Sequence, residues 1–556
     1  MRTDDSVGTD RNERLDEALA ILDRYFGRRN QEGLGPGLAV ALTDRSGLIG
    51  EFAYGFADAC RRTPVTPDTL FQIGSITKTI IGTACMRLAE RRALDLDAPV
   101  TEYLDWFDIR SPYAPITVHH LLTHTAGIAS MIDSVPASRF TVWLLRETDA
   151  LFPPGERFHY SNVGYGALGY VLENAAGLPL VDVIRSEVVE PLKMGDGTIA
   201  TTHELFDRIA RGHKNGPTDD RPPKPGDPFL PVPWFEFVSG CGSFTCAPRD
   251  LAAFLRMFLN RGEASGSLYL HPESLDRMTS DEHMTTPFED EYVFGYGLFT
   301  GTPERYGGHR IVKMGGENLG YEASMIGDVD DGVGVVIFVN SFAVPLAETD
   351  FALRVLQALA RGEAFPEAPR GETTDMRDPK DVAGVYRSNG DPLVCEVVDG
   401  KLVVSFRGER ADAHRLWGDT YQTSHSHLGR DLLRFARDEE TGKVVEAISG
   451  ALWFRGEACE GPDTFEAPAE WTAYIGHYRS FAPLIPSFRV VLRKGRLIVI
   501  WAGGYAETTL VDDGDGRFHS DPPSFAMEQV RFDAIADGRA QRCTLGGGTY
   551  VRVDTP

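Results

Sequence analysis

The stretch LFQIGSITKTI, residues 70–80, sets Ser75 three places before Lys78 in an otherwise apolar segment. Two interpretations fit it. In the first, a helix begins near Gly74, Ser75 caps its N-terminus and Lys78 points to solvent. In the second, Ser75 is a nucleophile and Lys78, one helical turn further on, is its base. An S-x-x-K motif recurs by chance in chains of this length, so the rest of the sequence has to decide.

The overall charge excludes two classes of partner. The chain of 556 residues has 56 basic and 81 acidic side chains, a net charge of −25, and a pI of about 5.0. No basic surplus is available to replace the counterions of a nucleic acid. The same charge opposes docking on an anionic membrane. We therefore expect neither a nucleic-acid partner nor a membrane partner.

Two features bear on the cellular compartment. Residues 1–27 lack the apolar segment and the small-residue cleavage site of a secretory signal. The seven cysteines, spread from Cys60 to Cys543, do not form a disulfide framework. Cys241 and Cys246 have no second pair to complete a zinc site, so we interpret both as buried thiols. These features predict a cytoplasmic protein.

A domain of the α+β class is predicted at residues 12–363. Residues 13–30 have apolar side chains at helical spacing, and residues 35–58 predict two strands joined by the turn DRSG. At the other end of the domain, strands are expected between residues 295 and 341, followed by a helix at 346–362. A sheet built from both ends of a domain, with helices inserted between, is a layered α+β arrangement, here an antiparallel sheet flanked by helices.

Beyond this domain the pattern changes to short alternating strands. Residues 364–379 are polar, contain proline and have no periodic pattern, which predicts a linker. The remainder divides into two segments of similar pattern, 380–466 and 467–556. Each is predicted to be a small antiparallel, lipocalin-like β-barrel.

An internal repeat supports this division. VAGVYRSNG at 382–390 matches YIGHYRSFA at 474–482, with Gly384 aligned on Gly476 at an offset of 92 residues. Further downstream the second copy gains three residues, which fall within FAPLIPSF at 481–488. This proline-containing apolar loop is either a contact element or a tolerated surface insertion.

A second motif lies in PPGERFHYSNVGYGALGY, residues 153–170, where Tyr160 and Asn162 stand two places apart before a predicted helix. A phenol can pass a proton to a leaving group, and an amide can hold a substrate carbonyl. Taken alone, a core tyrosine and an asparagine helix cap are the ordinary interpretations. Together with the serine and lysine upstream, the two residues favour a catalytic site.

S-x-x-K followed by Y-x-N resembles the class C β-lactamase and penicillin-binding family of serine acyl-transfer enzymes. Further stretches look like that family in the expected order: ALDLDAPVTEYL (93–104), TVHHLLTHTAGI (117–128) and DLAAFLRMFL (250–259). The resemblance covers about residues 30–345. It implies that Ser75 is the nucleophile and Lys78 its lysine. It also implies that Tyr160 is the proton shuttle and Asn162 the substrate-binding amide.

The third element of that family, a K-T-G or H-x-G strand beside the site, is where this chain departs. The segment reads HRIVKMGGENLGY, residues 309–321. Without a gap, the basic position is Met314, followed by Gly315 and Gly316. Lys313 is one residue earlier and reaches the same face only through a bulge or an altered register. We favour Lys313 as a K-x-G variant that binds substrate with Gly315 and Gly316. The alternative, Met314 facing the site, would weaken carboxylate binding.

The resemblance also implies an oxyanion hole, made by the backbone N–H of Ser75 and one from Gly316 or Glu317. No cofactor is needed for this chemistry.

Three histidines in the HHLLTHTAGI segment are expected to be structural. His119, His120 and His124 lie in a part of the chain that resembles a structural element of the family, which favours core hydrogen bonding over metal ligation. No set of metal ligands emerges from the sequence.

The architecture resembles the D-aminopeptidase branch of the family, in which a loop of the last barrel limits substrates to short peptides. By analogy, FAPLIPSF is the candidate for that loop here. The function implied is hydrolysis of amide bonds in short peptides or amino-acid amides, with D-residues or a free amine as options. An esterase, a β-lactam hydrolase and a catalytically weak ligand-binding homologue remain alternatives. A homo-oligomer is left open.

Overall fold

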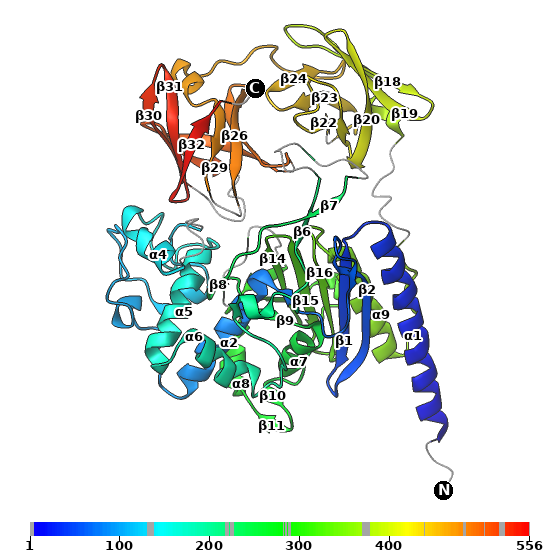
Figure 1. Cartoon of the computed structure of the whole chain (residues 1–556), viewed down its shortest axis with the longest axis vertical. Helices are drawn as coiled ribbons and strands as arrows, with labels where there is room; N and C mark the ends of the chain where they lie inside the picture. Colours follow the sequence, from blue (N-terminus) through cyan, green and yellow to red (C-terminus); the bar gives the residue numbers. More distant parts are fainter. Residues whose placement is uncertain are drawn as a thin grey trace. The chain divides into compact units, whose positions relative to one another are not determined.

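A computed structural model describes most of the chain. The chain forms two compact units (Figure 1). Unit 1 comprises Met1–Lys214 and Phe229–Pro369, and unit 2 comprises Asn215–Pro228 and Arg370–Pro556. The residues described are 5–130, 138–216, 222, 227–281, 283, 286, 291–369, 378–438, 440–481, 485–504, 506–521 and 529–554. The end of unit 1 falls within the predicted linker, whereas the inclusion of Asn215–Pro228 in unit 2 was not expected from the sequence.

Unit 1 is built on an eight-stranded antiparallel sheet in the order β12-β13-β14-β15-β16-β1-β2-β3. Its strands are β1 Gly37–Asp44, β2 Leu48–Asp58, β3 Thr63–Pro64, β12 Tyr292–Phe294, β13 Phe299–Gly301, β14 Ile311–Asn318, β15 Tyr321–Asp328 and β16 Val333–Val339. β1 pairs with β16, Leu38 opposite Val339, so segments from the two ends of the unit meet in mid-sheet. The predicted α+β domain with an antiparallel sheet is confirmed.

Helices cover both faces of this sheet. α1 and α9 contact each other on one face, and α7 packs against β1, β15 and β16 on the other (Figure 1). The α-helices are α1 Asp5–Gln31, α2 Thr77–Glu90, α3 Val118–Leu122, α4 Ser138–Trp143, α5 Asn162–Ala176, α6 Leu180–Ile184, α7 Pro248–Leu259, α8 Pro272–Met278 and α9 Leu346–Arg361. Short helices are η1 Gly74–Ile76, η2 Val100–Glu102, η3 Leu144–Glu147, η4 Arg185–Val189, η5 His203–Leu205, η6 Glu304–Tyr306, η7 Pro379–Val382 and η8 Ala469–Ala473. Among the described residues no single helix is long and apolar enough to cross a membrane, although α5 with Leu180–Val189, as a bent pair, meets that test of length and composition.

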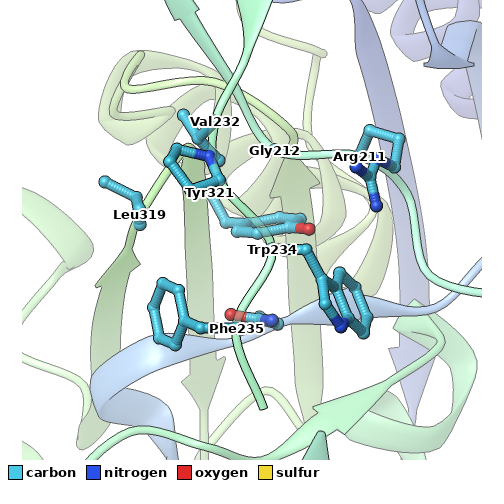
Figure 2. A pocket seen from close by; sticks show the side chains of 9 residues that line it. Arg211, Gly212, Val232, Trp234, Phe235, Leu319 and Tyr321 are labelled. Atoms are coloured by element: carbon cyan, nitrogen blue, oxygen red, sulfur yellow. The ribbon is translucent and has the colours of Figure 1, made fainter. Parts of the chain in front are cut away.

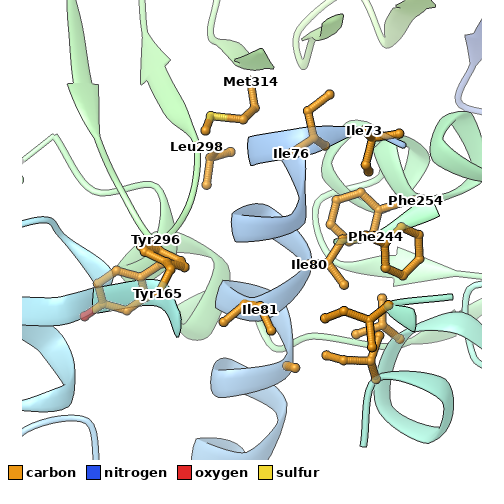
Figure 3. Close-up of a cluster of buried hydrophobic side chains, with 14 of the residues drawn as sticks. Ile73, Ile76, Ile80, Ile81, Tyr165, Phe244, Phe254, Tyr296, Leu298 and Met314 are labelled. Carbon is orange, nitrogen blue, oxygen red and sulfur yellow. The ribbon is translucent and has the colours of Figure 1, made fainter. Parts of the chain in front are cut away.

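The sheet separates two hydrophobic cores because side chains alternate along each strand. On β16, Val336 and Phe338 belong to the core that surrounds α2, whereas Val335 and Ile337 belong to the core under α1 and α9. Figure 3 shows α2 inside the first core, among isoleucine, phenylalanine and tyrosine side chains. A helix buried in this way gives a fixed support to the residues at its N-terminus.

Short strand pairs tie the loops of unit 1 together. They are β4 Phe71–Gln72 with β9 Thr245–Cys246, β5 Ala200–Thr201 with β8 Phe237–Val238, β6 His213–Asn215 with β7 Phe229–Pro231, and β10 Glu263–Ala264 with β11 Ser267–Leu268. The β4–β9 pair sets Gln72 opposite Thr245, close to the start of α2.

Unit 2 contains the two predicted β-barrels, each of eight antiparallel strands. The first has β17 Gly384–Tyr386, β18 Leu393–Val398, β19 Lys401–Phe406, β20 Glu409–Trp417, β21 Thr420–Thr423, β22 Leu433–Arg437, β23 Val444–Ser449 and β24 Leu452–Arg455. The second has β25 Gly476–Arg479, β26 Ser487–Arg493, β27 Arg496–Trp501, β28 Glu507–Gly514, β29 Arg517–Asp521, β30 Gln529–Ala536, β31 Arg539–Leu545 and β32 Gly548–Val553. A backbone bridge between Arg387 and Arg455 joins the ends of the first sheet, and β25 pairs with β32 in the second.

The repeat in the sequence is also a repeat in the structure. The aligned tyrosines lie in the first strands of the two barrels, β17 and β25. Each hydroxyl donates to the carbonyl four residues before it: Tyr386 to Val382 at 2.9 Å and Tyr478 to Tyr474 at 2.8 Å. Of the apolar loop at 481–488, residues 482–484 lie outside the described residues. Its assignment as a contact element stays a prediction.

Candidate active site

Ser75 lies in η1, immediately before α2. Of residues 71–80 it alone is not buried. Gly74 adopts φ +51°, and a Cβ at that position would lie 2.4 Å from the carbonyl oxygen of Glu317. Neither η1 nor α2, both fully described, is capped by a side-chain hydrogen bond. Ser75 is therefore not a helix cap; the turn presents its hydroxyl at the surface of a packed core.

The side chain of Lys78 is fully buried and donates three hydrogen bonds. Its Nζ lies 3.0 Å from Ser75 Oγ, 2.8 Å from Asn162 Oδ1 and 2.7 Å from the carbonyl oxygen of Cys241. Burial, which disfavours the charged form, lowers the pKa of Lys78 from 10.5 to about 8, against a weaker opposite effect of Cys241. A lysine with this pKa can accept the Ser75 proton near neutral pH.

Tyr160 completes the group around Ser75. The Lys78 Nζ lies 4.8 Å from the centroid of its ring, and the Ser75 side chain is near enough to lower the pKa of its hydroxyl. Burial raises the pKa of Tyr160 above its ordinary value of 10, and the opposing effect of the neighbouring Ser75 side chain is smaller. Tyr160 is therefore a neutral phenol that can donate a proton.

The ring of a buried histidine, His124, packs against the ring of Tyr160. The rings of His124 and Tyr160 have centroids 4.2 Å apart. The Nδ1 of His124 accepts the backbone N–H of Ser161 at 3.0 Å, and burial lowers the His124 pKa well below 6.5. The ring is therefore neutral, so it fixes the position of Tyr160 without adding a charge to the site. Sequence reasoning did not assign this positioning role.

The other two histidines of that segment are also hydrogen-bonded. His119 Nδ1 lies 2.8 Å from the Tyr296 hydroxyl. His120 and Thr117 form a reciprocal capping box at the start of α3. With the contact of His124, these bonds confirm that the three histidines make core hydrogen bonds.

The loop before α5 holds Tyr160 and Asn162 on either side of a helix cap. Ser161 Oγ accepts the N–H of Gly164 at 3.0 Å and donates to the carbonyl oxygen of Ala129 at 2.7 Å. Because Ser161 is the N-cap, the amide of Asn162 is not used for capping and remains available to the lysine.

The second half of β14 forms the strand edge beside Ser75. β13 pairs with β14 only as far as Lys313, and no other described strand covers the edge beyond it. A Cβ on Gly316 would lie 1.9 Å from the carbonyl oxygen of Ile73 and 2.9 Å from the backbone nitrogen of Ser75. This close approach of two backbones brings the amide of Ser75 beside those of Gly316 and Glu317, as the predicted oxyanion hole requires.

Lys313 points away from Ser75, so the prediction that it binds substrate there is wrong. Its Nζ lies 3.9 Å from the ring centroid of Tyr292, which belongs to the core under α1 and α9. β14 and β15 pair in register along their length, with no bulge to bring Lys313 to the other face. Gly315 lies exposed on the Lys313 face. Of the three residues predicted on this strand, only Gly316 adjoins Ser75.

Met314 occupies the face that the predicted lysine would have used. It is 3% exposed and packs in the core around α2, beside Leu298 and Ile76 (Figure 3). A thioether carries no charge and is a weak acceptor. The strand beside Ser75 therefore offers no cation to a substrate carboxylate at this position.

The segment around Cys241 has a role that residue type alone does not indicate. Cys241 and Cys246 are both free thiols, but Cys241 is half-buried rather than buried as predicted. Its backbone carbonyl, not its thiol, accepts a hydrogen bond from Lys78. The flanking Gly240 and Gly242 are the available signal: a Cβ on Gly240 would lie 2.3 Å from the carbonyl oxygen of Tyr165, so the chain needs glycine to come this close.

One group among the described residues has the donors for a metal ion. The ligand atoms of His309, Asp328 and Asp330 lie within 4.8 Å of one another. The carboxylate of Asp328 already accepts Gln357 Nε2 at 2.6 Å, and Arg361 Nη2 lies 3.8 Å from it. Because a guanidinium supplies the positive charge, we interpret this cluster as the support of a turn.

Comparison with known proteins places this site in a family. A family model described as Beta-lactamase matches residues 22–359. Esterase EstB of Burkholderia gladioli is 33% identical over 210 residues, covering 34% of this chain and 52% of that protein. Penicillin-binding protein 4* of Bacillus subtilis is 24% identical over 299 residues, covering 51% of this chain and 63% of that protein. The chain thus spans about half the length of the first curated relatives it matches.

Two solved structures have a similar fold. The octameric penicillin-binding protein homologue from Pyrococcus abyssi has a TM-score of 0.58 and 24% identity, over 78% of this chain and 98% of that one. The D-amino acid amidase from Ochrobactrum anthropi SV3 has a TM-score of 0.50 and 24% identity, over 64% of this chain and 99% of that one. At these identities the likeness concerns the fold alone.

Proposed function

This chain belongs to the beta-lactamase family of serine hydrolases, and we propose that it cleaves amide bonds of short peptides or amino-acid amides through an acyl-enzyme. The observation that carries the proposal is the group of Ser75, Lys78 and Tyr160, in which Lys78 bonds the Ser75 hydroxyl and lies against the ring of Tyr160. No cofactor takes part in this chemistry.

Acylation begins at Ser75. Lys78 in its uncharged form takes the Ser75 proton as Oγ attacks the carbonyl carbon. The oxyanion is held by the backbone N–H of Ser75 and that of Gly316 or Glu317. The Asn162 amide, which bonds Lys78, is close enough to the site to hold the substrate carbonyl as well.

Tyr160 distinguishes an amide hydrolase from a simple esterase. An amine must receive a proton as the C–N bond breaks, whereas a phenolate leaving group needs none. Tyr160 holds its proton because burial raises its pKa, and Lys78, protonated by Ser75, lies against its ring and can return that proton. Water then hydrolyses the acyl ester, with the same two groups moving the proton.

An esterase is the second candidate, and one observation favours it. Met314 leaves the strand beside Ser75 without a cation, so a substrate needs no carboxylate at that position. Cleavage of an activated ester, whose leaving group departs as a phenolate, would use Ser75 and Lys78 without requiring proton donation from Tyr160.

Intact-mass spectrometry after incubation with a fluorophosphonate tests whether Ser75 is activated. We expect one adduct on the native protein and none on Ser75→Ala. Hydrolysis of aminoacyl p-nitroanilides, including D-residues, and of p-nitrophenyl acyl esters then separates the two candidates. Turnover of esters alone would replace the amide proposal by the esterase. Turnover of a penicillin alone would make the protein a β-lactam hydrolase, and no adduct at all would leave a ligand-binding homologue.

A further inference from the structure

A small pocket in unit 1 lies close to the catalytic serine but is not used by the mechanism above. Gln72, Arg211, Trp234, Leu319 and Tyr321 are among the residues that line it (Figure 2). Gln72 precedes the serine by three residues, so its Cα lies within about 11 Å of the Cα of that serine. Leu319 follows β14, the strand whose backbone makes the edge of the site.

The pocket contains a positive charge with no counter-ion. Among the residues that the structure describes, no carboxylate lies within 4 Å of the Arg211 guanidinium, and its Nη1 is buried without a hydrogen-bond partner. The guanidinium is held by rings instead: its Cζ lies 4.1 Å from the ring centroid of Phe206 and 5.6 Å from that of Trp234. Arg208, three residues earlier, is paired with Asp196 at 2.5 Å. In a chain of net charge −25, Arg211 thus keeps an uncompensated positive charge beside this pocket.

An aromatic ring also lines the pocket, that of Trp234. Trp234 Nε1 is buried and has no hydrogen-bond partner. Figure 2 shows Trp234 and Arg211 on one side of the pocket, with Phe235 and Leu319 on the other. Buried donors are nearly always satisfied in folded proteins, so the unpaired Arg211 Nη1 at this pocket indicates a group that accepts from it.

The chemistry of the pocket selects the ligand group. A carboxylate presents two acceptor oxygens and a negative charge to a guanidinium, whereas a neutral amide would leave the charge uncompensated. The planar group would enter beside Trp234, whose ring also lies against the guanidinium. Because Met314 supplies no cation at the strand, a substrate carboxylate has no positive partner there and Arg211 offers one.

We propose that the Arg211–Trp234 pocket binds a carboxylate of the substrate, so that the enzyme selects short peptides or amides which carry a carboxylate within one or two residues of the cleaved bond. This inference rests on the proposed hydrolysis at Ser75 for its biological meaning. The binding site itself can be measured without catalysis.

Matched substrates test the selection. Each pair differs only in a carboxylate or a carboxamide, on the acyl side (Glu-p-nitroanilide and Gln-p-nitroanilide) or on the leaving side (Ala-Ala and Ala-Ala-amide). We expect Arg211→Gln to lower kcat/KM for the carboxylate member on one side by about ten- to a hundredfold and to change its carboxamide partner less than about twofold. Trp234→Phe keeps a ring against the guanidinium and should lower the same value less than Arg211→Gln does. Arg208→Gln is the control and should change neither member. Equal losses for both members of each pair, or no loss, would overturn the proposal.

A binding measurement separates this proposal from the proposed function. In Ser75→Ala, 3-phenylpropionate should bind at least tenfold more tightly than 3-phenylpropionamide by calorimetry, and adding Arg211→Gln should abolish the difference. If the fluorophosphonate fails to label Ser75 but this preference is found, the pocket stands and the hydrolase proposal fails. Equal binding of 3-phenylpropionate and 3-phenylpropionamide to Ser75→Ala would overturn the proposed carboxylate site, whether or not Ser75 proves to be reactive.

Discussion

Burial of Lys78 sets the pH at which Ser75 becomes reactive. With a pKa of about 8, roughly one tenth of Lys78 is uncharged at pH 7. We expect the rate of fluorophosphonate labelling to rise about tenfold per pH unit below 8 and to level off above it. Lys78→Met should lose most of the labelling at every pH. A midpoint near 10.5 would mean that the lysine is solvated and contradicts the buried site.

The hydroxyl of Tyr160 should matter for amides and not for activated esters. We expect Tyr160→Phe to lower kcat for an aminoacyl p-nitroanilide by about a hundredfold or more, the usual contribution of a general acid, and to leave p-nitrophenyl ester hydrolysis within about tenfold. Tyr165→Phe is the matched control, because this second buried tyrosine donates its hydroxyl to the carbonyl of Leu122 and not to the site. Equal losses on both substrates would remove Tyr160 as the acid.

The buried carboxyl group of Glu322 should make the free energy of unfolding depend on pH. It is 5% exposed, stands opposite Glu317 across β14 and β15, and has no ion pair with a described residue. Burial first, and then the charge of Glu317, raise its pKa from 4.5 to about 9. The folded protein therefore keeps a proton that the unfolded chain loses, so the free energy of unfolding falls as pH rises from about 4.5 to about 9.

Glu322→Gln removes this titration. In urea unfolding we expect the variant to be more stable than the native protein by about 1–3 kcal/mol at pH 8 and about equal to it at pH 4.5. The exposed Glu204→Gln serves as control and should change stability at neither pH. The same difference at both pH values would show that packing, not the proton, is responsible.

At the scale of the element, the contact between β14 and η1 holds the oxyanion site together. Gly316→Ala would place a methyl group 1.9 Å from the carbonyl oxygen of Ile73, so one of the two backbones must move. We expect fluorophosphonate labelling to slow by about a hundredfold, the usual loss when an oxyanion donor is misplaced. Gly315→Ala adds the same methyl to the same strand with its nearest neighbour at 3.9 Å, and should lose far less. Similar losses in both variants would place the sensitivity in the strand and not in this contact.

The strand β14 also shows where sequence reasoning stops at this scale. The existence of the strand and its glycines could be predicted from the local pattern. Which of Lys313 and Met314 faces Ser75 depends on an unbroken register with β15, a contact between residues that the local pattern leaves open. A single β-bulge between β14 and β15 would have turned Lys313 toward Ser75 in place of Met314.

At the scale of the whole molecule, the two barrels share the same strand number and the same tyrosine hydrogen bond. Tyr386 and Tyr478 make the same hydrogen bond to a carbonyl four residues earlier. We expect Tyr386→Phe and Tyr478→Phe each to lower the free energy of unfolding of unit 2 by about 1 kcal/mol in urea. Tyr113→Phe, at a tyrosine that is 39% exposed in unit 1, is the control and should have no effect. A loss of stability in only one of the two barrel variants would mean that the shared hydrogen bond does not stabilise both barrels, although the sequence repeats in both.

Sequence by itself determined the candidate residues of the proposed reaction and the order of the domains along the chain. Ser75 and Lys78 are neighbours on one helical turn, and Tyr160 and Asn162 on one loop, so their chemistry is visible at short spacing. The repeat around Tyr386 and Tyr478 likewise appears as a direct match. These features depend on residue type and on local periodicity, and both can be observed directly in the sequence.

Only the tertiary structure decided what depends on backbone groups and distant contacts. The carbonyl of Cys241 binds Lys78, yet every residue type has a carbonyl, so no letter marks it. Arg211 resembles any surface arginine until folding leaves it beside a pocket without an acid. The physical reason is the same in both cases: burial and partnership are properties of a place in the folded chain, and they set the charge and the reactivity of a group whose identity alone is written in the sequence.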